Sequence, residues 1–165
     1  MEIERKFIVD RSFIPPEEAE VHILEQGYLC LGDKEEVRLR FHQPFDRMVD
    51  GIEVKYYLTV KKGSGLVRGE VEVEIPLSVF EAFWFLTSKR RITKIRYILP
   101  GVHGRIKVDI YRDNLDGLIV AEAEFPSVEK AEKYQLEKWM LRDITLDNRY
   151  KNRALAVSQK IPEFN

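Results

Sequence analysis

Cysteine is almost absent from this chain, with Cys30 as the single example among 165 residues. One thiol excludes an intramolecular disulfide and a cysteine-based zinc site, and it fits a reducing compartment. Long apolar runs are also missing, since no segment approaches the roughly 20 residues that cross a bilayer, and the N-terminus begins with charged residues. We therefore expect a cytoplasmic protein with no membrane partner.

Neither sign of charge is in excess. The 27 Lys and Arg residues nearly balance the 28 Asp and Glu residues, and the formal net charge is -1. A nucleic-acid-binding surface usually needs a basic surplus, so we expect no nucleic-acid partner. The length, the 44% hydrophobic content and the lack of a Gly-, Ser- or Pro-rich linker indicate a single domain over residues 1–165.

Short segments that alternate between apolar and polar residues dominate the chain and predict β-strands. They lie near residues 2–9, 23–31, 35–43, 54–61, 68–75, 91–99, 105–111 and 118–125. Gly63-Ser64-Gly65 predicts a hairpin loop between the fourth and fifth strands. Amphipathic helices are predicted near 77–87, near 127–139 and after Asp147. The fold class is therefore α+β, and eight strands are enough to close an antiparallel β-barrel with flanking helices.

Charged residues occupy consecutive alternate positions on one face of these strands, often with one sign per strand. They are Glu2, Glu4 and Lys6; Arg38 and Arg40; Glu70, Glu72 and Glu74; Lys94 and Arg96; Lys107 and Asp109; and Glu122 and Glu124. For any one strand, a solvated outer face would explain the pattern. The residues between them are large and apolar, however, as in 37–41 and 71–75. We expect these apolar residues to pack outward against helices, which leaves the charges pointing inward.

Several carboxylates in one enclosure require a compensating cation. Two of them about 5 Å apart repel by about 3 kcal/mol at an effective dielectric constant of ~20. Oxygen ligands suit hard ions such as Mg²⁺ or Mn²⁺, whereas Arg and Lys side chains suit phosphate oxygens. The pattern therefore predicts a metal-bridged polyphosphate between an acidic and a basic wall.

A string of short motifs runs along nearly the whole chain. They are Glu2-Ile3-Glu4-Arg5-Lys6, Gln26-Gly27-Tyr28-Leu29, Val37-Arg38-Leu39-Arg40, Leu58-Thr59-Val60-Lys61, Arg68-Gly69-Glu70-Val71-Glu72, Lys94-Ile95-Arg96-Tyr97, Val108-Asp109, Glu122-Ala123-Glu124-Phe125 and Arg149-Tyr150-Lys151-Asn152. Together they resemble the CYTH, or triphosphate tunnel metalloenzyme, superfamily. This superfamily includes inorganic and thiamine triphosphatases, class IV adenylate cyclases and fungal RNA triphosphatases. The last motif is similar to that of compact bacterial members associated with metal-dependent hydrolysis of inorganic triphosphate.

The resemblance implies an eight-stranded antiparallel tunnel that binds Mg²⁺ or Mn²⁺ and cleaves inorganic triphosphate to pyrophosphate and phosphate. The implied phosphate ligands are Lys6, Arg38, Arg40, Lys61, Lys94 and Arg96, with Lys151 at one end. The implied metal ligands are Glu2, Glu4, Asp109, Glu122 and Glu124, with Glu70 and Glu72 completing the acidic wall. As catalytic residues we expect Glu2 or Glu4 to orient the attacking water, with Lys6 and Arg40 acting on the phosphates.

Other reactive or aromatic residues receive no catalytic role. His22, His42 and His103 form no spaced pair on one helix, and the tryptophans Trp84 and Trp139 fit helix packing. Tyr28 is a secondary candidate for substrate contact. The alternatives are a nucleoside or thiamine triphosphatase, a class IV adenylate cyclase, and a noncatalytic polyphosphate-binding module, which would not need the acidic set. The oligomeric state stays open.

Overall fold

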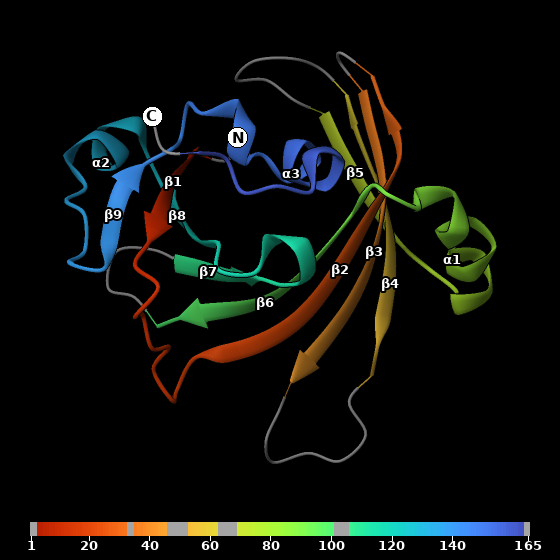
Figure 1. The fold of residues 1–165 in the computed structure, drawn as a ribbon, viewed down its shortest axis with the longest axis horizontal. Helices are drawn as coiled ribbons and strands as arrows, with labels where there is room; N and C mark the ends of the chain where they lie inside the picture. Colours follow the sequence, from red (N-terminus) through yellow and green to blue (C-terminus); the bar gives the residue numbers. More distant parts are fainter. Residues whose placement is uncertain (1–2, 33–34, 46–52, 63–68, 101–105, 164–165) are drawn as a thin grey trace.

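A nine-stranded antiparallel sheet organises the computed structural model, which describes residues 3–32, 35–45, 53–62, 69–100 and 106–163 (Figure 1). The strands are β1 (Ile3–Val9), β2 (Glu20–Leu31), β3 (Glu35–Phe45), β4 (Lys55–Lys62), β5 (Gly69–Ile75), β6 (Arg91–Leu99), β7 (Ile106–Tyr111), β8 (Ile119–Phe125) and β9 (Met140–Asp143). Their order across the sheet is β5-β4-β3-β2-β6-β7-β8-β1-β9. The helices are α1 (Leu77–Trp84), α2 (Val128–Lys133) and α3 (Asn152–Ser158), with 3₁₀ turns η1 (Phe85–Thr87), η2 (Asp113–Leu115) and η3 (Asn148–Tyr150).

The α+β class and all eight predicted strands are confirmed, but the prediction of a helix over 127–139 is wrong beyond Lys133. Tyr134 takes an extended backbone, with φ −66° and ψ 124°. Its ring packs against Phe7 at 5.9 Å and against Phe125 at 5.1 Å between ring centroids. This contact turns the chain back along the sheet, where the unpredicted β9 pairs with β1. The predicted Gly63-Ser64-Gly65 turn lies outside the described residues.

The sheet is strongly curved but open. Strands β5 and β9 are its two edges, and they do not pair with each other within the described residues. The predicted strand number of eight is therefore wrong, because β9 adds a ninth, and a closed barrel is not confirmed. In Figure 1, α3 lies over the concave side of the sheet, whereas α1 and α2 lie outside it.

Two apolar clusters lie on opposite sides of the curved sheet. On the outer side, Phe7, Val108 and Ala121 are fully buried in a cluster that also includes residues of α2 and β9. On the concave side, Ile92 and Tyr111 belong to a second cluster that includes buried residues of α3. Helix α3 therefore covers one end of the concave face.

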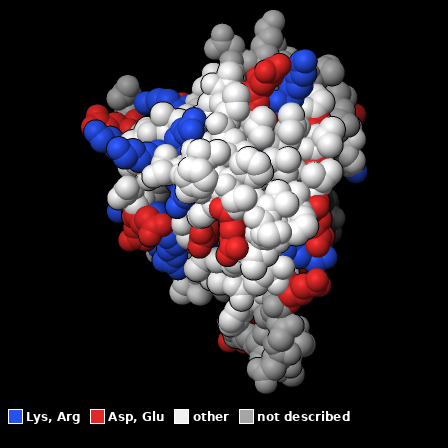
Figure 2. Space-filling view, turned by 90° about the vertical axis from the view of Figure 1, so that its right-hand side faces the viewer, with Lys and Arg blue, Asp and Glu red and all other residues white. Residues whose placement is uncertain are grey.

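The expected outward packing of the apolar residues is only partly confirmed. Leu39 is 1% exposed, but Val71 and Val73 on the edge strand β5 are 64% and 46% exposed. Helix α1 reaches β4, where Phe80 packs against Tyr56 with ring centroids 4.8 Å apart. Figure 2 shows the side of the molecule that bears α1, where uncharged residues cover much of the surface. Among the described residues, no helix has the length and apolar character needed to span a membrane.

Candidate functional site

Strand register brings the predicted site residues to one face of the sheet. Directly paired residues of neighbouring antiparallel strands point to the same side. Lys6 pairs with Glu122, Arg96 with Asp109, and Arg40 with Gln26. The shared face contains Glu4, Lys6, Arg38, Arg40, Lys61, Glu70, Glu72, Lys94, Arg96, Asp109, Glu122 and Glu124. It is the concave face, because Ile92 and Tyr111, which belong to the cluster beneath α3, have the same register. Glu2 lies outside the described residues.

Asp109 lies at the centre of a buried ion cluster. Arg96 donates to both of its carboxylate oxygens, at 2.7 and 2.8 Å, and Lys94 donates to one of them. Burial favours a higher pKa for Asp109, but the charges and hydrogen bonds of Arg96 and Lys94 outweigh it and lower that pKa. Burial, followed by the charge of Arg96, lowers the pKa of Lys94 to about 8. Asp109 therefore orients two cations and is not a free metal ligand in this structure.

A second group of ion pairs lies on β3, β4 and β5. Arg40 donates to Glu72 at 2.6 Å, and the Lys61 ammonium lies 2.9 Å from Glu70. The Nε atoms of Arg38 and Arg40 are buried donors with no acceptor among the described residues. Burial lowers the pKa of Arg40, and although Glu72 raises it, the nearby charges of Arg38 and Arg96 lower it further. An anion between these arginines would accept the unused hydrogen bonds and relieve their mutual repulsion.

The third group joins β1, β7 and β8. The Lys6 ammonium lies 2.8 Å from Glu122 and 3.6 Å from Glu4, and Lys107 contacts Glu124. Burial would raise the pKa of Glu122, yet Lys6 and the other nearby cations lower it to about 2. Glu122 is therefore ionised throughout the neutral pH range.

The carboxylates of this third group have the donor chemistry of a hard-metal site. Glu4 and Glu124 are cross-strand partners, and Glu122 lies on the same face two residues from Glu124. Within the described residues, however, no three Asp, Glu, His or Cys side chains are arranged to hold a metal ion. Lys6 and Lys107 lie against the three carboxylates. A metal ion bound here would replace lysine contacts with carboxylate–metal contacts.

A cavity of about 160 Å³ lies where the concave face meets the segment that follows β9. It brings together six predicted residues from four strands and this segment: Glu4, Lys6, Tyr28, Arg38, Lys61 and Lys151. Glu36 was not among the predicted site residues, but it lines the same cavity and lies 3.9 Å from Arg38. The alternation of Glu36 with Arg38 and Arg40 was the signal that could have identified it. Asn152, which belongs to the same predicted motif as Lys151, also lines this cavity, whereas no local pattern indicated that Thr145 would do so.

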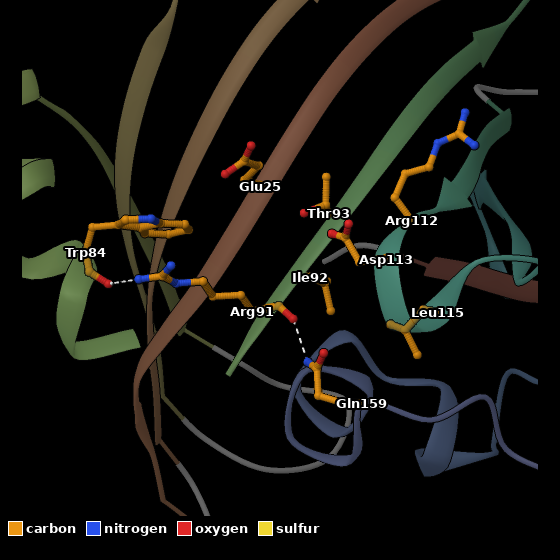
Figure 3. A pocket seen from close by; sticks show the side chains of 9 residues that line it. All are labelled: Glu25, Trp84, Arg91, Ile92, Thr93, Arg112, Asp113, Leu115 and Gln159. Atoms are coloured by element: carbon orange, nitrogen blue, oxygen red, sulfur yellow. Dashed lines mark hydrogen bonds between the residues drawn. The ribbon is translucent and has the colours of Figure 1, made fainter. Parts of the chain in front are cut away.

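A larger cavity, of about 260 Å³, lies elsewhere and is lined by none of the predicted site residues (Figure 3). Its wall includes Trp84 and Arg91, whose guanidinium lies 4.3 Å from the centre of the indole ring. Arg91 also donates to the main-chain carbonyl of Trp84. Phe80 stacks on Trp84 with ring centroids 4.8 Å apart, so the predicted packing role of this tryptophan is confirmed. The arginines and lysines that we predict to bind phosphate therefore do not line this second cavity.

Comparison with known proteins gives the chain two near-full-length relatives. The inorganic triphosphatase of Nitrosomonas europaea is 36% identical over 158 residues, which cover 95% of this chain and 97% of the relative. The inorganic triphosphatase of Acetivibrio thermocellus is 33% identical over 156 residues, or 93% of this chain and 92% of the relative. The chain belongs to the CYTH superfamily of triphosphate tunnel metalloenzymes.

Solved structures agree with this assignment of the CYTH protein. The crystal structure of the inorganic triphosphatase NE1496 matches it with a TM-score of 0.72 and 33% identity, covering 99% of this chain and 97% of that one. The PH1819 protein of Pyrococcus horikoshii matches with a TM-score of 0.52 and 19% identity, covering 80% of this chain and 82% of that one. This second likeness shows a shared fold alone. No protein-family profile matches the CYTH chain.

Proposed function

We propose that this CYTH protein hydrolyses inorganic triphosphate to pyrophosphate and phosphate on the concave face of its sheet, with Mg²⁺ or Mn²⁺ as cofactor. The observation that carries the proposal is the proximity of Arg38, Arg40 and Arg96. The buried Nε donors of Arg38 and Arg40 have no acceptor in the part of the chain that the structure describes. A polyphosphate chain has the charge and the closely spaced oxygens to satisfy them. The names of the two curated relatives support the same substrate.

The phosphate chain would be held by cations that other residues already orient. Glu72 fixes Arg40, and Asp109 fixes Arg96 together with Lys94. We assign Lys6, Arg38 and Lys61 to one end of the chain, where they line the 160 Å³ cavity with Lys151. Because a carboxylate already orients each of these cations, less side-chain entropy is lost when the substrate binds. The positive charge of Arg40 and Arg96 would stabilise the transferring phosphoryl group.

Glu4, Glu122 and Glu124 would hold the metal ion, with Glu2 as a fourth ligand. The bound ion would neutralise phosphate charge and acidify a water molecule. Lys6 and Lys107, which contact these carboxylates, would then turn their ammonium groups toward phosphate oxygens. Glu4 is our choice for orienting the attacking water, because its side chain is 38% exposed and the most accessible of the described set. We assign Glu70, Glu72 and Asp109 to the positioning of cations instead of metal binding.

The test of the reaction is a product assay with three substrates. Phosphate, pyrophosphate and cyclic AMP would be measured from inorganic triphosphate, ATP and thiamine triphosphate, each with Mg²⁺, Mn²⁺ or a chelator. We expect metal-dependent phosphate and pyrophosphate release from inorganic triphosphate at the highest kcat/KM. Faster cleavage of ATP or thiamine triphosphate would show that inorganic triphosphate is not the preferred substrate. Binding without turnover would indicate a noncatalytic polyphosphate-binding module.

Arg40→Ala tests the phosphate site. Removing this partly buried cation from a bound phosphate should lower kcat/KM for triphosphate roughly 30- to 5,000-fold, which corresponds to about 2–5 kcal/mol. Arg112→Ala is the matched control, because the Arg112 side chain is 46% exposed and lies outside the concave face. Equal activities of the two variants would contradict the assignment of Arg40.

A further inference from the structure

Two histidines that have no role in the proposed reaction face each other on the concave side. His22 Nδ1 and His42 Nε2 are 2.9 Å apart, and the ring centroids are separated by 5.0 Å. A hydrogen bond between two imidazole nitrogens requires one to donate and the other to accept. The two rings therefore share one proton across strands β2 and β3.

The pair lies next to the arginines assigned to phosphate. His42 is two residues beyond Arg40 on the same face of β3, and His22 is the cross-strand partner of Arg96. The titratable groups facing the pair from the surrounding strands are Glu20 on β2, Arg40 on β3, Lys55 and Tyr57 on β4, Glu72 on β5, and Lys94 and Arg96 on β6. Arg40 and Arg96 thus connect the pair to the proposed phosphate path.

The surroundings of the pair oppose a positive charge while no anion is bound. Burial lowers the pKa of His42 to about 4, and His22, Arg40 and Arg96 contribute to the shift, against a weaker effect of Glu72. His42 is therefore neutral at neutral pH, although its ordinary pKa is 6.5. A bound polyphosphate would neutralise the two arginines and remove the repulsion that keeps this imidazole neutral.

We propose that the His22–His42 pair is a further substrate-binding unit, which takes up one proton when a phosphate chain binds beside Arg40 and Arg96 and then donates a hydrogen bond to a phosphate oxygen. This inference rests on the proposed function, because it requires the phosphate chain at that place. The proton comes from solvent or buffer and forms an N–H bond on the outer, unprotonated nitrogen of the ring that donates within the pair, so the hydrogen bond between the two rings is kept. The pair then carries a charge opposite to that of the phosphate.

The coupling between proton uptake and triphosphate binding determines how the affinity depends on pH. If binding raises the pKa of His42 from about 4 toward or above the ordinary 6.5, proton uptake occurs between these values. Affinity for triphosphate should then rise by about tenfold for each pH unit lowered within this window, relative to a pair that cannot titrate. Above the window, the pair should add no pH dependence.

Calorimetry on the full chain tests the proposal without turnover. Inorganic triphosphate would be titrated with a chelator present, in two buffers of different ionisation enthalpy, at several pH values from 4.5 to 7. The double variant His22→Asn, His42→Asn keeps polar groups on both strands but cannot titrate. Glu25→Gln is the matched control, because Glu25 lies on β2 but on the opposite face from His22. Triphosphate itself releases protons on binding, and this contribution cancels when the proton uptake of the parent is compared with that of the variants.

We expect the parent and Glu25→Gln to take up about one proton more than the double variant at pH values between 5 and 6. Equal proton uptake in the double variant and the parent, at equal unfolding midpoints, would overturn the proposal and leave the pair as a link between β2 and β3. If this double variant does not fold, the double variant His22→Gln, His42→Gln provides the same comparison, because neither glutamine titrates. Failure of the parent to bind triphosphate at any pH would instead overturn the proposed function.

Discussion

Asp109 contacts Lys94 and Arg96 with its side chain only 1% exposed, so each charge in this cluster depends on the others. Burial of a single ion is costly, and the hydrogen-bonded contacts between opposite charges offset that cost. Glu72 acts in the same way on Arg40, and Glu122 on Lys6. At the scale of the residue, the carboxylates of the concave face position the cations that we assign to phosphate.

Asp109→Asn should destabilise the fold by about 3–5 kcal/mol, because Lys94 would remain buried without its counter-ion. Urea unfolding at neutral pH measures this change. Glu129→Gln is the control, since the Glu129–Lys133 pair is about three-quarters exposed and should contribute little. Similar unfolding free energies for the two variants would show that the buried cluster does not stabilise the fold.

Glu122 should make stability depend on acid pH. Its pKa is about 2 in the folded state, below the ordinary 4.5, so its ion pairs stabilise the fold fully above pH 4.5. This stabilisation should be lost progressively as the pH falls from 4.5 toward 2. The measurement is the difference in unfolding free energy between the parent and Glu122→Gln across this range, with chelator present. A difference that stays constant down to pH 2 would contradict the depressed pKa.

Individual elements are placed by contacts on both sides of the sheet. Helix α3 buries Leu155 and Ala156 completely, and it covers the end of the concave face where charged residues give way to apolar ones. On the outer side, η1 approaches β2 so closely that there is no room for a side chain at Gly27. A Cβ at this position would lie 2.4 Å from Thr87 Oγ1 and 2.7 Å from Trp84.

Gly27→Ala should therefore destabilise the protein by about 1–3 kcal/mol, because η1 must move away from β2. Gly32→Ala is the matched control, since its nearest contact would be an ordinary 3.7 Å from Glu35. Thermal or urea unfolding of both variants provides the measurement. If Gly32→Ala loses as much stability as Gly27→Ala, the close contact between η1 and β2 is not the cause of the destabilisation.

Charged residues of both signs line the inner side of the curved sheet, in a molecule whose net charge is only -1. Glu70 and Glu72 lie on the edge strand β5, whereas Glu4 lies near the other edge, on β1. The curvature of the sheet turns both regions toward the same concave space, so Glu4 and Lys61 line one cavity. This arrangement allows cations and carboxylates from distant strands to act on one ligand.

Magnesium should stabilise the whole fold if Glu4, Glu122 and Glu124 hold it. A ligand at about 100 times its dissociation constant stabilises the native state by about 2.7 kcal/mol, and a chelator should abolish the effect. Glu4→Gln should weaken this shift, whereas Glu74→Gln should retain it because Glu74 lies on β5 and is 53% exposed. The measurement is the unfolding midpoint with and without Mg²⁺ at constant ionic strength. An unchanged midpoint in the parent would contradict the metal site.

The sequence by itself predicted the strands, the α+β class and the shared face of the charged residues. These features depend on local alternation, since a period of two determines which side chains point the same way. The motif order also indicated the superfamily. Lys151 could be assigned to the site only through the family resemblance, because no local pattern connects it with Lys6, Arg38 and Lys61, which lie far earlier in the chain and line the same cavity.

Only the tertiary structure decided features that depend on contacts between distant segments. The ring contacts of Tyr134 end α2 and lead to β9, and the curvature of the sheet leaves its two edges unpaired with each other in the described part of the chain. Long-range contacts also decided that Asp109 pairs with Lys94 and Arg96, and that His22 meets His42. The physical reason is that ion pairing and ring packing depend on three-dimensional distance, whereas strand formation depends mainly on neighbours in the sequence.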